Sequence, residues 1–481
     1  MGYSTLHSIK WSLLDTYAGF VLKFVFTVMI TRKLTPHDFG IVAYMGLFLG
    51  IATWLSEGGF GSALIQNQNT DQTDYSTAWI FNMGVALLFF ILYFIISGFV
   101  ADFFNEPALK WIMRITSINL LFNSICYIHT IKLIKAINFH SQAIVNFISS
   151  FFSGSLGLLL AYIGWGYWAL ILMTLSGSMF RAIGYLIVTK WYPSLVFSIN
   201  SFREQFRFGS NVFIQGLLES IFKEMYSLVI GKTYNTNNLG LYSRGYKFYE
   251  LFMINTGIAF NKVLYPTMSI KSTDRVYHKE SYFRYYDLLF FISAPISLFL
   301  ILLSKPIIIY IFTKKWLGAV IYMRLYCIAG FIFILIYFNS STLLSMNKPR
   351  LYLKMDIIQK MLFLCALIIT FKISIPAIII GWLLAYYIYY IFYEYVMYKY
   401  GFANKMKYLN MLKVLFSLIP SIIVFILLRN IFYEMSVIFV LQTVSIPFVY
   451  IIFNRIFKLS AYQDFACIVR PSIPRSLRWI V

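Results

Sequence analysis

Apolar stretches of roughly 20 residues follow one another along almost the whole of this 481-residue chain. Each is long enough to cross a hydrocarbon core of ~30 Å as a helix, and most connections between them are short. The pattern predicts about fourteen membrane-spanning helices, at residues 10–31, 38–57, 76–100, 109–133, 141–163, 167–189, 209–231, 240–266, 284–303, 318–345, 352–371, 374–397, 411–429 and 436–456. We therefore expect an all-α transmembrane fold.

Polar residues interrupt this pattern in two stretches, 11–40 and 211–240, which look like copies of one another. Asp15, Gly19 and Lys23 recur every four residues in the first, and Gln215, Glu219 and Lys223 do so in the second. This spacing places them on one side of a helix. A lysine inside a membrane span is rare because burying its charge costs several kcal/mol. Its recurrence predicts two half-molecules that face a shared polar cavity.

The repeat predicts four parts. Residues 1–195 and 196–400 form two pseudo-symmetric six-helix lobes, joined by a hinge-like basic connection at 194–207. Residues 401–460 add two C-terminal helices, expected to pack at the periphery, and residues 461–481 form a basic cytoplasmic tail.

The repeat continues beyond the first helix of each half. Arg114 in the fourth span corresponds approximately to Arg324 in the tenth, and residues 136–138 match residues 345–347.

Composition excludes a soluble globular protein, since 60% of the residues are apolar and only 12% are charged. The net charge of +22 lies mostly in connections, where Lys and Arg face anionic headgroups. Their excess on one side predicts a multi-pass protein with both termini in the cytoplasm. Because these charges are scattered over many connections, we expect no nucleic-acid partner.

Few residues offer catalytic or metal chemistry. The four cysteines, Cys126, Cys327, Cys365 and Cys467, show no CxxC spacing, and the five histidines show no ligand spacing. No GxSxG, P-loop or GxGxxG motif stands in a strand–turn–helix setting. We therefore predict no metal, no catalytic residue and no enzyme activity.

Several motifs spread over both halves carry a family resemblance. They are Glu57–Gln66 with Asp74–Asn82, then Leu239–Tyr246, Tyr265–Ser269 and Lys315-Trp316. With this set, in this order and spacing, the chain resembles the bacterial O-antigen and capsule flippases (Wzx-type), the polysaccharide branch of the multidrug/oligosaccharidyl-lipid/polysaccharide exporter superfamily.

The resemblance implies two six-helix lobes around a central V-shaped cavity in the bacterial inner membrane. It implies transport of undecaprenyl-pyrophosphate-linked oligosaccharide by alternating access, for O-antigen, capsule or exopolysaccharide synthesis. The polysaccharide polymerase and chain-length machinery are the partners it implies, besides the lipid bilayer. The sequence does not identify the sugar.

Charge alone agrees with such a substrate, because a pyrophosphate in hydrocarbon needs cations to offset its charge. The candidate cations of the cavity are Lys23, Lys223, Arg114, Arg244 and Arg324. An alternative stays open in which Lys23 and Lys223 pair with Asp15 or Glu219 in a neutral helix-packing seam. Arg244 has a second reading as well, in which it snorkels to the headgroups.

Five tyrosines on helices that the resemblance places beside the cavity are candidates for stacking on sugar rings. They are Tyr17, Tyr44, Tyr226, Tyr242 and Tyr246.

Three carboxylates at membrane depth raise the question of what drives the cycle. Asp15, Glu219 and Glu224 are candidates for a proton- or sodium-linked switch, because desolvation favours their protonated form and a nearby lysine the ionised one. Apart from a coupling proton or sodium ion, we expect no cofactor.

Three other functions are weighed against the flippase. A cation-coupled small-molecule exporter of the same superfamily would have a more acidic cavity, and a lipid II flippase would use similar cavity cations. A polymerase or ligase needs a large outer loop with basic catalytic residues, and the longest outer connections here have only about a dozen residues.

Overall fold

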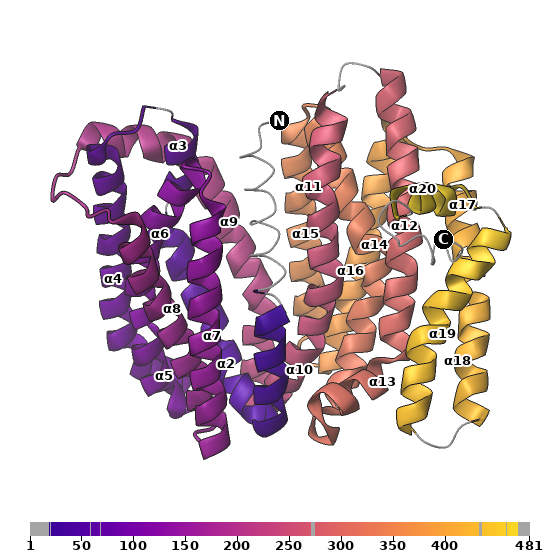
Figure 1. The fold of residues 1–481 in the computed structure, drawn as a ribbon, viewed down its shortest axis with the longest axis horizontal. Helices are drawn as coiled ribbons and strands as arrows, with labels where there is room; N and C mark the ends of the chain where they lie inside the picture. Colours follow the sequence, from indigo (N-terminus) through magenta and orange to yellow (C-terminus); the bar gives the residue numbers. More distant parts are fainter. Residues whose placement is uncertain are drawn as a thin grey trace. The chain divides into compact units, whose positions relative to one another are not determined.

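The computed structural model describes residues 19, 21–57, 59–67, 69–270, 275–431, 435–457 and 459–469, and within these ranges it contains helices and turns but no strand (Figure 1). The expected all-α fold is confirmed. The chain forms two compact units, Met1–Gly240 and Leu241–Val481. The predicted lobe boundary near residue 195 concerns the sequence repeat and stays a prediction.

The first unit begins, in its described part, with helical residues 21–33. The labelled helices are α2 (Pro36–Glu57), α3 (Phe60–Gln66), α4 (Gln72–Phe104), α5 (Ala108–Thr116), α6 (Ile118–Lys135), α7 (Phe139–Ile163), α8 (Tyr167–Thr189), α9 (Ile199–Thr233) and the start of α10 (Thr236–Tyr249). Helix α6 packs between α4 and α8, and α7 packs against α8. Helix α2 packs against both α4 and α9.

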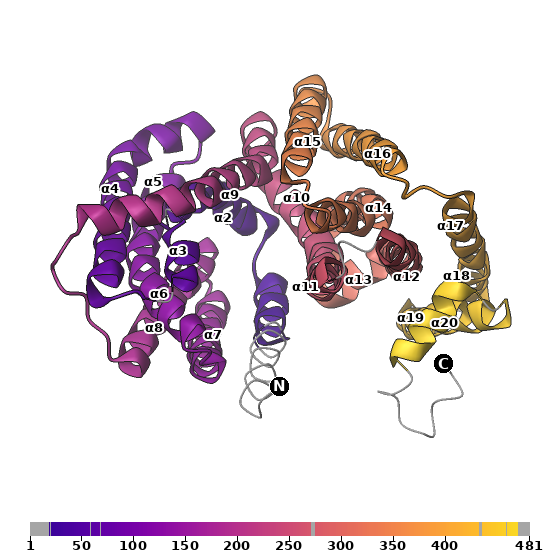
Figure 2. The ribbon, with the colours of Figure 1, turned by 90° about the horizontal axis from the view of Figure 1, so that it is seen from above.

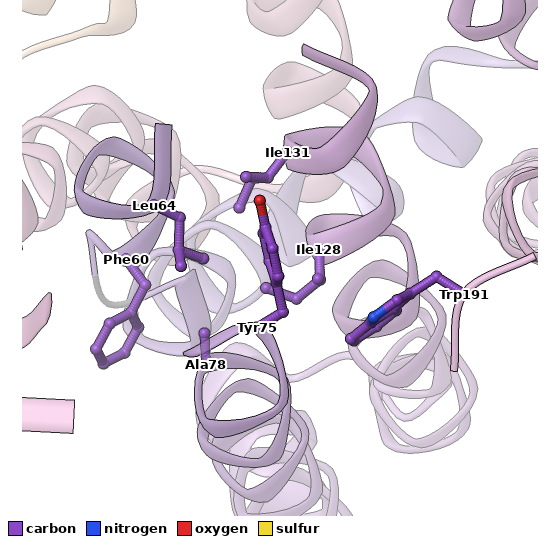
Figure 3. Packing of buried hydrophobic residues seen from close by; sticks show 7 residues of the cluster. All are labelled: Phe60, Leu64, Tyr75, Ala78, Ile128, Ile131 and Trp191. Carbon is purple, nitrogen blue, oxygen red and sulfur yellow. The ribbon is translucent and has the colours of Figure 1, made fainter. Parts of the chain in front are cut away.

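A hydrophobic cluster closes one end of the first unit (Figure 3). Phe60 and Leu64 of α3 pack there with Tyr75 of α4 and with Trp191, which follows α8. The short helix α3 begins at Gly59, whose φ of 74° is in the left-handed region that glycine adopts without strain. The cluster therefore packs residues 60–66 of the Glu57–Gln66 motif as a short helix.

The connection expected to act as a hinge is hydrogen-bonded to helix α4. The backbone N–H of Ser194 donates to Ser76 Oγ at 3.0 Å, and that of Ser198 donates to Thr77 Oγ1 at 3.1 Å. Helix α9 already begins at Ile199, so the second half of the predicted connection is helical. Serine and threonine side chains of α4 thus hold the first residues of this connection, and its action as a hinge stays a prediction.

Helices α2 and α9 pack closely because glycines remove side chains from α9. A Cβ on Gly216 would lie 2.3 Å from the Trp54 ring, and one on Gly231 would lie 2.2 Å from the Tyr44 ring. The Tyr44 hydroxyl donates to the carbonyl of Gly231 at 2.9 Å. The contact between α2 and α9 therefore combines close packing with a hydrogen bond between the two helices.

Two repeat-related glycines make equivalent close contacts near the start of α2. A Cβ on Gly40 would lie 1.8 Å from the carbonyl oxygen of Thr236, and one on Gly240 would lie 1.7 Å from the carbonyl oxygen of Pro36. The starts of α2 and α10 thus approach backbone to backbone in a local two-fold arrangement. Only glycine permits such an approach.

The second unit contains the rest of α10, followed by η1 (Glu250–Ile254), α11 (Asn255–Ile270), α12 (Arg275–Leu302), α13 (Ser304–Ile307), η2 (Ile308–Phe312), η3 (Lys314–Trp316), α14 (Ala319–Ser345), α15 (Pro349–Thr370), α16 (Ile375–Lys399), α17 (Lys405–Ser417), α18 (Ile419–Ile431), α19 (Met435–Ile456) and α20 (Ser460–Val469). Helix α14 packs against α11, α12 and α16, and α15 packs against α16. Helices α18 and α19 lie side by side (Figures 1 and 2).

A buried ion pair joins α17 to the centre of this unit. Lys407 Nζ lies 2.6 Å from Glu394 Oε2, and both side chains are almost completely buried. Lys407 also donates to Tyr282 Oη at 3.1 Å, and Tyr408 Oη donates to the same Glu394 oxygen at 2.9 Å. The Asn339 amide donates to Glu394 Oε1 at 3.4 Å, so α12, α14, α16 and α17 meet at one carboxylate.

The other C-terminal helices also attach to α12. The Tyr450 hydroxyl of α19 donates to the carbonyl of Phe291 at 2.9 Å, and Arg284 forms an ion pair with Asp464 of α20 at 2.7 Å. The Tyr450 contact agrees with the packing role expected for residues 401–460, and Asp464 belongs to the predicted tail 461–481.

Among the described residues, nine helices are long and apolar enough to cross a membrane. The expected spans outside these nine are 10–31, 109–133, 209–231, 240–266 and 352–371, and residues 10–18 and 20 of the first lie outside the described residues. All five carry charged side chains within the span. Those over 109–133 and 240–266 are also divided into shorter helices.

The repeat is visible in backbone geometry, with a register one residue from that expected. Ile137 and Asn347 both follow a long helix and both have a positive φ, 54° and 57°. The preceding amides match too, because Ala136 N donates to Lys132 O and Met346 N donates to Thr342 O, both at 3.0 Å. The structural offset here is therefore 210 residues, and Ala136 corresponds to Met346 rather than to Ser345.

The glycine contact yields a stability prediction. Replacing Gly40 with Ala forces a methyl group against the Thr236 carbonyl, so the free energy of unfolding should fall by about 1–3 kcal/mol. Thermal unfolding in detergent, followed by tryptophan fluorescence, measures the midpoint. Gly84→Ala is the matched control, since a Cβ there meets nothing within 4 Å. Equal midpoints for the two variants would contradict the close approach.

The buried ion pair yields a second prediction. Lys407→Met should destabilise the protein by about 3–5 kcal/mol, because it leaves the Glu394 carboxylate buried without its cation. Adding Glu394→Gln should restore most of the unfolding midpoint, since the carboxylate charge is then removed. Lys405→Met, at an exposed position two residues away, is the control. Failure of the double variant to recover would show that the cost is not electrostatic.

Candidate functional site

Two repeat-related arginines make the same contact in their own units. Arg114 Nε donates to Ser97 Oγ at 2.9 Å, and Arg324 Nε donates to Ser304 Oγ at 2.6 Å. Each serine hydroxyl in turn donates at 2.8 Å to the carbonyl three residues before it. The approximate sequence match between the two arginines is therefore confirmed at the level of hydrogen bonding.

Burial follows the same repeat. From 111 to 120 and from 321 to 330, the order of buried, half-buried and exposed residues is identical at an offset of 210. Both arginines are half-buried in this pattern. Each unit therefore presents its arginine in the same local environment.

These arginines keep donors for a ligand. The Arg114 guanidinium lies 4.2 Å from the Phe94 ring centroid and 5.3 Å from that of Trp111. In the described part of the chain, Nε is the atom through which Arg114 and Arg324 donate, and neither side chain pairs with a carboxylate there. The terminal nitrogens therefore remain for bidentate contact with a phosphate.

Arg244 is arranged differently. It is only 9% exposed, and its guanidinium lies 5.8 Å from the Phe312 ring centroid and 5.9 Å from that of Trp316. The structure thus brings together the Leu239–Tyr246 and Lys315-Trp316 motifs. Snorkelling to headgroups does not describe this buried side chain.

Lys23 and Lys223 are exposed on helical segments expected to cross the membrane. Glu219, one turn before Lys223, is exposed as well. A charged side chain that faces lipid at membrane depth is costly, so exposed charges there imply contact with water. The three side chains are exposed in the structure, and both the cavity lining and the pairing of the lysines with carboxylates stay predictions.

Glu224 lies in the seam between α9 and α2 instead. Its Oε2 atom is 2.8 Å from the position that a Cβ on Gly46 would take, so the glycine makes room for the carboxylate. One turn earlier, Ser220 Oγ lies 2.6 Å from the same position on Gly50. The structure therefore separates Glu224 from Glu219, which is on an exposed side of the helix.

The remaining sequence predictions concern Asp15 and the tyrosines expected to stack on sugar rings. Asp15 and Tyr17 lie outside the described residues. Tyr44, Tyr226 and Tyr242 are at least 95% buried, so their rings are packed against protein and are not open to a sugar. The stacking role predicted for these three is therefore wrong.

Sequence reasoning missed two ion pairs of the second unit. Lys360 pairs with Asp356 one helical turn away in α15, and Glu394 pairs with Lys407 of the next helix. The i,i+4 spacing of the first pair was a usable signal. No signal of this kind marks the second, because it joins two helices.

The five candidate cations are divided between the two units, with Lys23, Arg114 and Lys223 in the first and Arg244 and Arg324 in the second. Among the described residues, no group of three His, Cys, Asp or Glu side chains is placed to hold a metal ion. Each of the five carries a positive charge, and the arginines have donors suited to a phosphate.

Comparison with known proteins identifies the family of the chain. Residues 29–321 match the family described as polysaccharide biosynthesis protein. The teichuronic acid biosynthesis protein TuaB of Bacillus subtilis (strain 168) is 23% identical over 350 residues, 71% of each chain. The lipopolysaccharide biosynthesis protein WzxC of Escherichia coli (strain K12) is 19% identical over 373 residues, 76% of this chain and 75% of that one.

A solved structure shares the fold. The lipid II flippase MurJ in an inward closed conformation superposes with a TM-score of 0.77 at 16% identity, covering 95% of this chain and 99% of its own. The resemblance seen in the sequence is thus confirmed, and the match covers both units. The chain belongs to the polysaccharide biosynthesis protein family, as a multi-pass membrane protein with a transporter fold.

Proposed function

We propose that this protein flips undecaprenyl-pyrophosphate-linked oligosaccharide repeat units across the bacterial inner membrane. The observation that carries the proposal is the exposure of Lys23 and Lys223 on helical segments that the sequence predicts to cross the membrane. Its relatives are named for the biosynthesis of teichuronic acid and lipopolysaccharide, both of which are surface polymers.

The negative charge of the proposed substrate explains why a transporter for it would need cations. A pyrophosphate linkage carries about two negative charges, and each would cost many kcal/mol in hydrocarbon without a partner. Exposed lysines supply point charges, and Arg114 and Arg324 add planar groups for bidentate contact. No bond of the substrate needs to break, so the protein acts as a transporter and not as an enzyme.

The repeat supports transport by alternating access through a cationic cavity. Two similar halves of one chain permit a site to open to one side of the membrane and then to the other. The excess of Lys and Arg in the connections on one side favours both termini in the cytoplasm. A polymerase and chain-length machinery on the outer side would then receive the flipped unit.

A small-molecule exporter of the same fold is the competing function. It would require a cavity rich in carboxylates to hold organic cations. Here the exposed charges on α9 and on residues 21–33 include both lysines of the repeat, and this favours an anionic substrate.

Complementation of a flippase-deleted strain tests the proposal. The wild type should restore surface polymer, and Lys23→Ala or Lys223→Ala should reduce it about tenfold or more at matched membrane abundance, because each loses a charge-assisted contact. Lipid-linked repeat unit should accumulate in both variants. Arg203→Ala, exposed near the start of α9, is the control.

If both lysine variants complement fully, these residues are structural. Failure of the wild type across several repeat-unit chemistries would favour the small-molecule exporter.

Ion coupling is proposed for Glu219, whose exposed carboxylate stands one turn from Lys223. In vesicles, dissipating the proton or sodium gradient should slow flipping severalfold, and Glu219→Gln should remove that sensitivity because its side chain no longer titrates. Glu204→Gln, exposed on the same helix, should keep the sensitivity. A flipping rate independent of both gradients would contradict the coupling.

A further inference from the structure

A pocket with three cations lies where α14 connects to α15 in the second unit. Its volume is about 440 Å³, and its lining includes Lys348, Arg350, Lys354 and the ring of Tyr400. Lys348 Nζ lies 6.0 Å from the centroid of that ring. Of the residues that line this pocket, all within the described ranges, none is acidic. The site is therefore a concave, positively charged surface.

A fourth cation lies close by. Lys279 Nζ of α12 is 3.9 Å from the position that a Cβ on Gly401 would take, next to Tyr400. Within the described part of the chain, no carboxylate forms an ion pair with Lys279, Lys348, Arg350 or Lys354. The positive charge of this surface is thus not neutralised by the protein residues that the structure describes.

The repeat supplies an internal comparison. The turn at Asn347 has the same positive φ as the turn at Ile137 in the first unit. At the offset of 210, the three cations Lys348, Arg350 and Lys354 replace Asn138, His140 and Ile144. The same backbone turn therefore forms without this charge, so the fold does not require the three cations.

The charges also work against the local helix. In the first unit, the Asn138 side chain accepts a hydrogen bond from Ser141 N and caps α7. At the equivalent position Lys348 makes no side-chain cap, and the first turn of α15 contains no acidic residue. Cations at a helix N-terminus are unfavourable because the backbone already places positive charge there. A sequence that breaks this local rule without a packing reason is typical of a binding surface.

We propose that this pocket binds the phosphate of an anionic phospholipid headgroup. Helix α14, which ends at the pocket, is long and apolar enough to span the membrane, so its end lies at the level of the headgroups. Arginine and lysine complement a phosphate, and the tyrosine hydroxyl supplies a further donor. The inference concerns the surrounding bilayer and holds whatever substrate the protein transports.

Lipid binding to the purified full-length protein tests the proposal. Native mass spectrometry in detergent would compare phosphatidylglycerol, phosphatidylcholine and inorganic phosphate as probes. The triple variant Lys348→Gln/Arg350→Gln/Lys354→Gln should lose phosphatidylglycerol affinity by about fivefold or more, since each juxtamembrane cation contributes to binding an anionic lipid. Phosphatidylcholine binding should not change.

A matched control removes the same charge elsewhere in the unit. The variant Lys305→Gln/Lys314→Gln/Lys372→Gln changes three exposed residues in other connections and should retain the affinity. The variant Lys348→Arg/Lys354→Arg keeps the charge and should also bind as the wild type does. An equal loss in both glutamine variants would show that net charge alone attracts the lipid, and would overturn the proposal.

Two further outcomes would also overturn it. The pocket would be a site for soluble anions if inorganic phosphate competed with phosphatidylglycerol at equal concentration. Unchanged lipid affinity in the pocket variant would show that the pocket is not occupied by lipid. Because the three side chains are exposed, unchanged thermal unfolding in phosphatidylcholine nanodiscs confirms that each variant is folded.

Discussion

The high cost of charge in hydrocarbon is the constraint on which the rest of this structure depends. Charges at membrane depth meet it in two ways. Some are buried in ion pairs, as in Glu394 with Lys407 and Lys360 with Asp356. Others, such as Lys223, are exposed and need water. The Glu394–Lys407 pair joins two helices, whereas the Lys360–Asp356 pair lies within one helix.

Duplication explains why the two units resemble each other and makes their differences informative. Arg114 and Arg324 keep the same serine contact and the same burial, as expected when a local environment is retained in both copies. Where the copies differ, as at Asn138 and Lys348, one side chain caps a helix and the other contributes to a charged pocket. Each residue of the second copy can thus be compared with the residue at the equivalent position of the first.

Much of the fold could be predicted because hydropathy is a local property of about 20 consecutive residues. The match between Arg114 and Arg324 was also accessible, since the repeat preserves order along the chain. The contact of Lys407 with Glu394 was not, because it depends on how four helices pack. The burial of Tyr44 was missed for the same reason, since its position is set by a glycine on another helix, Gly231.

We propose that the candidate cations recognise the pyrophosphate of the substrate. Binding of lipid-linked oligosaccharides that differ only in this linkage tests it most directly. We expect the pyrophosphate-linked compound to bind about tenfold or more tightly than its monophosphate-linked counterpart at low salt. Added salt should reduce this difference in affinity. Equal affinity for the two compounds would contradict recognition of the pyrophosphate, because the sugar or the lipid would then determine binding.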